Sequence, residues 1–198
     1  MAAVSNRQRI HLERTFGQTQ SVAREASIVK IFVTFRRGDE LRLLKIYSHY
    51  VANTAITFEC TVPPVEEFQS RIARTLENFP YLVAEHDEKI IGFAYAGNFG
   101  GREAYKFSAE LTIYLDKNFR GRGVGRKLYR KLEKLLAQRG TTNLYACVAY
   151  PEIEDEFLSR ASLKFHERPG FNVCGKFTNC GEKFNRRYSM VYMEKFLQ

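Results

Sequence analysis

A glycine-rich stretch that joins two regular patterns is the part of this chain best suited to chemistry. Apolar and polar residues alternate from Phe107 to Leu115, as they do along a strand with one buried face. After residue 123, valine and leucine recur at helical spacing until Gly140, where a helix stop is expected. Between these patterns lies the run Arg120-Gly121-Arg122-Gly123-Val124-Gly125. The sequence therefore predicts a strand, a glycine-rich loop and a helix in direct succession.

That order of elements favours an anionic ligand. Glycine lets the backbone approach a ligand closely, and the first turn of a helix offers free N–H groups and a partial positive charge. Arg120, Arg122 and Arg126 add full positive charges at the same place. The loop lacks the closing G-K-S/T of a Walker A motif and the G-x-G-x-x-G order of a dinucleotide fold. The pattern indicates a phosphate or pyrophosphate site, and a tight glycine-rich turn without a ligand is the alternative.

Length and composition describe the scaffold that must position this loop. The 198 residues, 44% hydrophobic and 14% aromatic, predict one folded domain with a substantial core. No apolar run approaches the about 20 residues that span a membrane, and no signal-peptide pattern opens the chain. We therefore expect a cytoplasmic protein without a membrane partner. Cys60, Cys147, Cys174 and Cys180 form no C-x-x-C pair, which favours free, mostly buried thiols over zinc or disulfides.

The net charge of +9 suits an anionic partner, whether nucleic acid, lipid or a small molecule. Much of this charge follows the glycine loop on the predicted helix, where Glu133 is the one acid. A solvated outer face accounts for most of it, while the excess beside the loop suits a ligand with several phosphates. The basic residues of this stretch are Arg122, Arg126, Lys127, Arg130, Lys131, Lys134 and Arg139.

The remaining patterns predict a single α/β domain over 28–198, preceded by a tail over 1–27 that has no sustained apolar period. The nearly all-apolar run 143–150 is expected to be a buried, central strand. The last two strands are expected to pair antiparallel and to join near Gly181. Predicted strands cover 28–35, 81–85, 90–96, 107–115, 143–150, 171–179 and 184–196, and predicted helices cover 39–51, 65–79, 124–139 and 154–167.

This element order, with the glycine loop after the fourth strand, resembles the GNAT superfamily of acetyl-CoA-dependent N-acetyltransferases. The loop matches the acyl-CoA signature Q/R-x-x-G-x-G/A of that family, with Arg120, Gly123 and Gly125 at its fixed positions. Four segments are similar to the phosphinothricin N-acetyltransferase branch: I-Y-S-H-Y-V-A-N-T-A-I-T-F-E, A-Y-K-F-S-A-E-L-T-I-Y-L, G-V-G-R-K-L-Y and S-L-K-F-H-E-R-P-G-F. The resemblance covers residues 28–196 and implies the GNAT fold, a central mixed β-sheet flanked by helices.

The resemblance also implies the residues that bind acetyl-CoA as cosubstrate, with no metal. The backbone of the strand before the loop would pair with the pantetheine arm. The loop and the first turn of the helix would cradle the pyrophosphate through main-chain N–H groups. The implied binding residues are Ile113, Tyr114, Leu115, Arg120, Gly121, Arg122, Gly123, Val124, Gly125 and Arg126.

For catalysis the resemblance points first to Glu110, which matches a glutamate of the phosphinothricin branch. An ammonium must lose a proton before its nitrogen can attack, and Glu110 would accept that proton directly or through water. The alternative is a carboxylate that only binds the substrate ammonium or pairs with a nearby arginine. His166 stands where many GNAT enzymes carry a tyrosine as general acid, and a structural role for it is left open. Tyr129 would reach the sulfur of CoA or simply pack.

The acceptor pocket implied by the resemblance is lined by Phe58, Glu59, Tyr105, Phe107 and Tyr188. The acidic run 152–156 departs from the herbicide-detoxifying members and would attract a cationic amine beside the cleft. The expected reaction is acetylation of a primary amine on a small molecule, such as an amino acid, an antimicrobial or a phosphinothricin-like compound. Alternatives are acetylation of a protein N-terminus or lysine, and a non-catalytic relative that binds CoA or nucleic acid. A homodimer without a nucleic-acid partner is expected.

Overall fold

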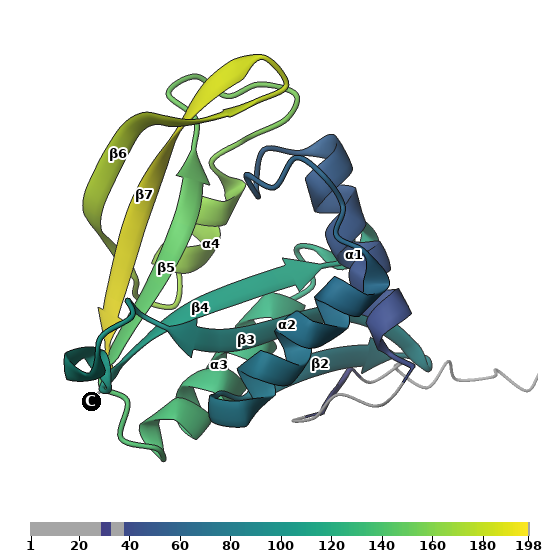
Figure 1. Ribbon diagram of the computed structural model, residues 1–198, viewed down its shortest axis with the longest axis vertical. Coiled ribbons are helices and arrows are strands. Elements are labelled where there is room, and N and C mark those ends of the chain that lie inside the picture. Colours follow the sequence, from purple (N-terminus) through teal and green to yellow (C-terminus); the bar gives the residue numbers. More distant parts are fainter. Residues whose placement is uncertain (1–28, 33–37, 198) are drawn as a thin grey trace, which may run out of the picture.

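The computed structural model describes residues 29–32 and 38–197, so the predicted tail over 1–27 lies outside the described residues (Figure 1). Each predicted strand and helix corresponds to one of its elements. The strands are β1 (Lys30–Phe32), β2 (Tyr81–His86), β3 (Lys89–Asn98), β4 (Ser108–Leu115), β5 (Asn143–Tyr150), β6 (Asn172–Lys183) and β7 (Arg186–Phe196). The helices are α1 (Glu40–Asn53), α2 (Val65–Asn78), α3 (Val124–Ala137) and α4 (Ala161–Glu167), with the short 3-10 helices η1 (Glu103–Tyr105) and η2 (Lys117–Phe119).

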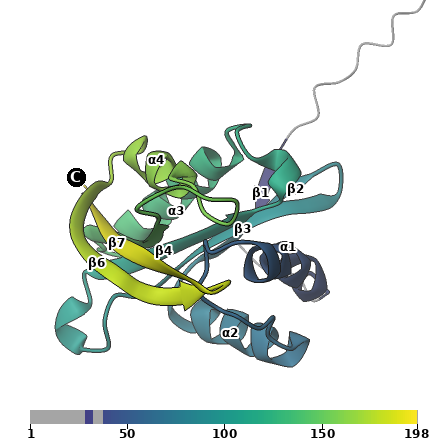
Figure 2. The same ribbon diagram turned by 90° about the horizontal axis from the view of Figure 1, so that it is seen from above.

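The strands form one seven-stranded sheet in the order β1-β2-β3-β4-β5-β7-β6. Each neighbouring pair is antiparallel except β4 and β5, which are parallel and therefore need a crossover connection, supplied by α3. Helices α1 and α2 lie on one side of the sheet, and α3 and α4 lie on the other (Figure 2). The predicted mixed sheet flanked by helices is thus confirmed.

Two hairpins are closed by two-residue turns with positive φ at both central residues. Asp87 and Glu88 have φ of 48° and 59° between β2 and β3. Phe184 and Asn185 have φ of 54° and 57° between β6 and β7. Such turns match the right-handed twist of the flanking strands. The expectation that the last two strands join near Gly181 is wrong, because Gly181 lies inside β6, where it pairs with Tyr188.

The fourth helix is much shorter than the pattern over 154–167 predicts, since it begins only at Ala161. Acidic side chains take the backbone N–H groups of the preceding segment. Asp155 accepts from the N–H groups of Phe157 and Leu158, and Glu154 accepts from that of Arg160. Side-chain bonds of this kind offer the backbone an alternative to the helix. The apolar spacing was real, but these local bonds hold the segment in a loop.

Helices pack on both faces of the sheet. On the α3 side, Leu128, Leu132 and Leu136 join a large core that also contains Leu144 of β5. On the α1 and α2 side, the core is rich in aromatic rings. None of the helices in the described part of the chain combines the length and apolar character that crossing a bilayer requires.

Strand β5 is central in the sheet, but only one of its faces is fully buried. Leu144, Ala146 and Val148 are buried, whereas Cys147 between them is exposed. The prediction of a strand buried on both faces is therefore wrong. The four cysteines are free, but all are exposed, which contradicts the expectation of mostly buried thiols. The open face of β5 contributes to the site described next.

Candidate active site

The sheet is split between β4 and β5. These parallel strands pair only from Ser108 with Asn143 to Glu110 with Tyr145, and they diverge beyond that point (Figure 1). The part of β4 from residue 111 to 115 therefore has β3 on one side and a gap on the other. A strand edge without a partner presents N–H and C=O groups that an extended ligand can pair with.

Alternate residues of β4 direct their backbone polar groups into this gap. The carbonyl of Phe107 accepts from the N–H groups of Thr142 and Asn143 on the β5 side, which fixes that direction for every second residue. Leu115 has the same direction, but its N–H and C=O both bond to the hydroxyl of Tyr50, at 3.3 and 2.5 Å. Of the three residues predicted to pair with pantetheine, Ile113 and Leu115 thus direct their groups into the gap, and those of Leu115 are bonded to Tyr50. Tyr114 directs its groups toward β3.

The glycine loop leads from the end of β4 to the first turn of α3. Gly121 and Gly123 have φ of 74° and 77°, a conformation that side chains with a Cβ rarely adopt, and nothing lies within 4 Å of a Cβ built on either. Gly123 is the N-cap of α3, so the first N–H groups of the helix point toward this open space. At Gly125, by contrast, a Cβ would lie 2.7 Å from the ring of Phe165. The open loop leaves the anion site a prediction, while Gly125 lets α3 and α4 pack closely.

The three arginines of the loop form no ion pair within the described part of the chain. Arg120 donates from Nε to the hydroxyl of Tyr50 at 3.3 Å, and its guanidinium lies 4.9 Å from the centre of that ring. Arg122 stacks in the same way on Phe119, at 5.0 Å. Aromatic faces thus hold two of the three cations beside the loop.

Glu110 lies on β4 at the point where β5 separates, on the face that carries α1 and α2. Its neighbour in β5 is Tyr145. Burial raises the pKa of the Glu110 carboxyl above its ordinary value. Within the described residues no arginine forms a salt bridge with it, so the alternative of a local ion pair finds no support. A half-buried carboxylate with a raised pKa, next to a gap that leads to the glycine-rich loop, is suited to accept a proton.

Several residues around Glu110 were not predicted. Burial is the main cause of the raised pKa of Tyr95 in β3 and of Tyr192 in β7, and the negative charge of Glu110 raises both further. Arg71 of α2 is also near Tyr95, and it forms a salt bridge with Glu59 at 2.5 Å. The tyrosines lie in strands with ordinary alternation, and Arg71 lies on an ordinary helix, so the sequence carries no local signal for them. The register of the sheet brings them together.

His166 and Tyr129 form a buried pair on the other side of the sheet, between α3 and α4. The Tyr129 hydroxyl lies 2.8 Å from Nε2 of His166, and Nδ1 of His166 lies 2.8 Å from the carbonyl of Ser162. Because a carbonyl only accepts, Nδ1 carries the proton and Nε2 accepts from Tyr129. Burial lowers the pKa of His166 to about 4. All hydrogen-bonding capacity of the imidazole is used inside the protein.

The residues predicted to line the acceptor pocket fall into two groups at opposite ends of β5. Phe58 packs against Gly181, and Tyr188 is buried in the same cluster, near the Tyr150 end. Tyr105 and Phe107 are exposed near the Asn143 end, where β4 begins. Seven residues of strand separate these ends, or about 23 Å at the usual rise. Besides burial, which is the main cause, the charge of Glu59 raises the pKa of Tyr95, as the charge of Glu110 does.

The acidic run 152–156 was expected to present free negative charge beside the cleft, but most of its carboxylates are paired. Glu152 pairs with Lys176 at 2.6 Å, and Asp155 and Glu156 both pair with Arg186 at 3.0 and 2.8 Å. These bonds tie the segment to β6 and β7. Its acids hold the loop against the last hairpin, so the expectation that they attract the acceptor is wrong.

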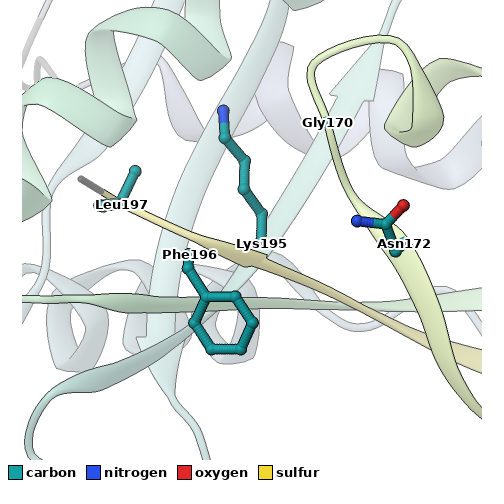
Figure 3. Close-up of a pocket in the computed structure, with 5 residues that line it drawn as sticks. All are labelled: Gly170, Asn172, Lys195, Phe196 and Leu197. Carbon is teal, nitrogen blue, oxygen red and sulfur yellow. The ribbon is translucent and has the colours of Figure 1, made fainter.

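A separate hollow lies at the end of β7 and is lined by Gly170, Asn172, Lys195, Phe196 and Leu197 (Figure 3). Lys195 and Phe196 point in opposite directions, as neighbours along a strand do. The ammonium of Lys195 is bonded to both oxygens of Glu133 at 2.8 Å. With its cation neutralised and no predicted site residue among its walls, this hollow is not the active site. The described residues also contain no group of three or more metal-ligating side chains.

A glycine-rich loop at a helix start, a split sheet and a half-buried carboxylate are the arrangement that a group transfer from a phosphate-bearing donor would need. Residues 32–192 match the family described as the acetyltransferase (GNAT) domain. The chain therefore belongs to the GNAT family of acetyltransferases, and it is an N-acetyltransferase.

Relatives and solved structures agree with this assignment. The chain is 34% identical over 161 residues to phosphinothricin N-acetyltransferase of Alcaligenes faecalis, covering 80% of this chain and 79% of that protein. It is 29% identical over 160 residues to the L-amino acid N-acyltransferase MnaT of Escherichia coli, covering 80% and 89%.

Among solved structures, an N-acetyltransferase from Staphylococcus aureus Mu50 has a TM-score of 0.79 at 26% identity, over 87% of this chain and 100% of that one. A phosphinothricin acetyltransferase from Sinorhizobium meliloti in complex with acetyl-CoA has a TM-score of 0.76 at 28% identity, over 86% and 88%. A ribosomal-protein-alanine N-acetyltransferase from Brucella melitensis has a TM-score of 0.75 at 31% identity, over 85% and 99%.

Proposed function

We propose that this N-acetyltransferase moves the acetyl group of acetyl-CoA to the primary amine of a small molecule of the amino-acid type. The observation that carries the proposal is the position of Glu110. Its carboxylate lies at the mouth of the gap between β4 and β5, and the gap leads to the glycine loop at the start of α3. In this arrangement the loop holds the pyrophosphate, the gap holds the pantetheine arm, and the thioester lies near Glu110.

The reaction then needs one nucleophilic step with help from a base. The neutral amine nitrogen attacks the thioester carbonyl and forms the C–N bond, and the tetrahedral intermediate collapses by breaking the C–S bond. Before the attack, the substrate ammonium loses one proton to Glu110, directly or through water. After the attack, the nitrogen loses a second proton to solvent, and CoA leaves as a thiolate that takes up a proton from solvent. The raised pKa of Glu110 favours this role, because a base works best when its pKa is near the working pH.

For Tyr129 and His166 we infer a structural role in place of the expected acid. Their hydrogen bonds are made to each other and to the Ser162 carbonyl, and both side chains are almost completely buried. A group with a pKa of about 4 is also a poor proton donor at neutral pH, because it is already deprotonated. Solvent is the simpler source of the proton for the thiolate.

The amino-acid type of acceptor is supported by the relatives, whose names concern phosphinothricin and L-amino acids. A second candidate is the N-terminal amine of a protein. The structural neighbour named for ribosomal-protein alanine supports it, together with the exposure of the open face of β5 at Cys147, which would admit a peptide. Both candidates use the same donor site and the same base.

The test is release of CoA thiol from acetyl-CoA with a panel of acceptors. The panel holds phosphinothricin, the common L-amino acids, simple alkylamines, and peptides that begin with alanine or contain one lysine. Acetylated product is confirmed by mass spectrometry. Turnover with free amino acids or phosphinothricin but not with peptides supports the first candidate, and the reverse supports the second. Binding of acetyl-CoA without turnover of any acceptor would contradict both. Sedimentation equilibrium tests the predicted homodimer.

A further inference from the structure

We propose that α1 carries two positioning residues, Tyr50 for the donor and Tyr47 for the acceptor. The inference rests on the proposed function, since it assigns roles toward acetyl-CoA and an amine. Both side chains are buried on the face of α1 that packs on the sheet. Their rings both make edge contacts with the ring of Tyr114 in β4, each with a centroid distance of 4.9 Å. Tyr47 and Tyr50 of the same helix thus meet at one ring of β4. Tyr50 acts on the edge of β4, and Tyr47 acts on residues 54–59.

The hydroxyl of Tyr50 caps the free edge of β4 at its loop end. It donates to the carbonyl of Leu115 at 2.5 Å, and it accepts from the N–H of Leu115 and from Nε of Arg120, both at 3.3 Å. A tyrosine hydroxyl has one hydrogen to donate and two lone pairs, so these three bonds use all of its capacity. The single hydroxyl therefore connects the strand edge to the arginine of the acyl-CoA signature.

This cap determines which part of the edge an extended ligand can use. The backbone groups of Leu111, Ile113 and Leu115 face the gap, and those of Leu115 are already occupied. A pantetheine arm is therefore limited to the part of β4 nearer Glu110. Without the cap, the arm could pair two residues further along the strand, which withdraws the thioester from Glu110 by about 7 Å. Displacements much smaller than this abolish attack, since reacting atoms must lie within about 3–3.5 Å.

Tyr47 acts on the segment that follows α1, over residues 54–59. Its hydroxyl lies 3.1 Å from Oγ1 of Thr57, which also accepts the N–H of Glu59 at 3.3 Å. The carbonyl of Thr57 accepts from the buried ammonium of Lys183 at 2.8 Å. Thr57 is thus fixed by bonds to its side chain and to its carbonyl. It places Glu59 in a salt bridge with Arg71, near Tyr95, on the face of the sheet that carries Glu110.

The experiment compares Tyr50→Phe with Tyr47→Phe, two changes that each remove one hydroxyl from the same helix. Isothermal titration with acetyl-CoA gives the Kd and the number of sites. Steady-state kinetics with an acceptor that the panel identifies gives kcat and the acceptor KM. For Tyr50→Phe we expect kcat to fall about 100-fold, because the thioester is misplaced. We expect its acetyl-CoA Kd to stay within about threefold, because the displaced arm still finds a strand edge. The number of sites should be unchanged.

For Tyr47→Phe we expect the opposite pattern: the acceptor KM rises about tenfold while the acetyl-CoA Kd is unchanged, since only the acceptor segment is loosened. A purely structural role for Tyr50 would instead lower the number of acetyl-CoA sites in proportion to kcat, and that result overturns the proposal. So would similar patterns in both variants, or a kcat of Tyr50→Phe within about threefold of wild type. If the wild type binds no acetyl-CoA, the proposed function itself fails, which separates the two outcomes.

Discussion

The hydroxyl of Tyr129 donates to Nε2 of His166 across 2.8 Å, in a site where both side chains are almost completely buried. Phe165 and Phe171 pack edge-on against the same imidazole, with centroid distances of 5.1 and 5.7 Å. This pair joins α3 to α4 behind the glycine loop. An imidazole enclosed in this way is neutral in the folded protein, and its protonation should open the contact.

Stability should therefore depend on pH through His166. Burial lowers its pKa from 6.5 to about 4, so between these values the unfolded chain binds more protons than the folded one. Stability is greatest above pH 6.5 and falls as the pH drops toward 4. We expect the free energy of unfolding to fall by about 2 kcal/mol from pH 7 to pH 5 because of this group. Urea unfolding of wild type and His166→Gln at both pH values measures it, and an equal pH dependence in the two proteins would rule the assignment out.

Glu110→Gln tests the base. We expect turnover to fall about 100-fold or more, because glutamine cannot accept the proton, while acetyl-CoA affinity stays near that of wild type. Burial raises the pKa of Glu110, so wild-type kcat/KM should fall with decreasing pH at a higher pH than for an exposed glutamate. This fall of kcat/KM at low pH should be absent in Glu110→Gln.

The matched control for this change is Glu194→Gln. Tyr145 of β5 pairs with Glu110 on one side and with Glu194 of β7 on the other. Glu194 is therefore a carboxylate at the same level of the sheet, two strands away from Glu110. Glu194 is half-buried on β7, one strand beyond Tyr145, so turnover of the control should stay within about twofold of wild type. Thiol release at saturating acetyl-CoA gives both values. A larger loss in Glu194→Gln than in Glu110→Gln would move the base to β7.

The sequence predicts the geometry of the glycine-rich loop, because its signals are local. Glycines at positions of positive φ, a helix start and arginines all lie within the short run that ends at Arg126, and the structure places them around one open space. Alternation along β4 likewise predicts that Glu110 lies on the face opposite the α3 core. Local patterns of this kind reflect backbone constraints that need no tertiary contact.

The acceptor half depends on strand register, which no local pattern contains. Tyr95 and Tyr192 come near Glu110 only because β3 and β7 lie where they do in the sheet. The expected grouping of Phe58 with Phe107 fails for the same reason, since those residues lie at opposite ends of β5. The helix predicted from residue 154 fails because Asp155 bonds to nearby backbone N–H groups, a competition that apolar spacing does not reveal.

Two glycine substitutions should separate strain from packing in the loop. In Gly125→Ala the new Cβ would lie 2.7 Å from Phe165, whose ring packs on Tyr129, so we expect a loss of about 1–3 kcal/mol and weaker acetyl-CoA binding. Gly123→Ala meets nothing within 4 Å, and only its φ of 77° is unfavourable, at about 1 kcal/mol. Urea unfolding and titration with acetyl-CoA test both. Gly125→Ala with wild-type stability would mean that Phe165 moves freely.

Asp155 should hold the segment between β5 and α4. Its carboxylate accepts from the Tyr188 hydroxyl at 2.8 Å and from Arg186 at 3.0 Å, besides two backbone N–H groups. Burial raises the pKa of Asp155, but these hydrogen bonds outweigh it, and the net pKa lies below 3.8. Its stabilisation is therefore complete above that value and is lost only as the pH falls through the lowered pKa.

We expect Asp155→Asn to lower the free energy of unfolding by about 2 kcal/mol at pH 7, because the amide removes an acceptor and a charge from partners that are partly buried. Glu156→Gln is the control, since Glu156 pairs with the same Arg186 at 2.8 Å but is exposed, and it should cost clearly less than Asp155→Asn. Equal losses in the two variants would show that the charge on Arg186 matters more than the bonds to Tyr188 and the backbone. Because Phe157 of this segment accepts the N–H of Ala55 at 3.0 Å, the Asp155 variant should also raise the acceptor KM while leaving the acetyl-CoA Kd unchanged.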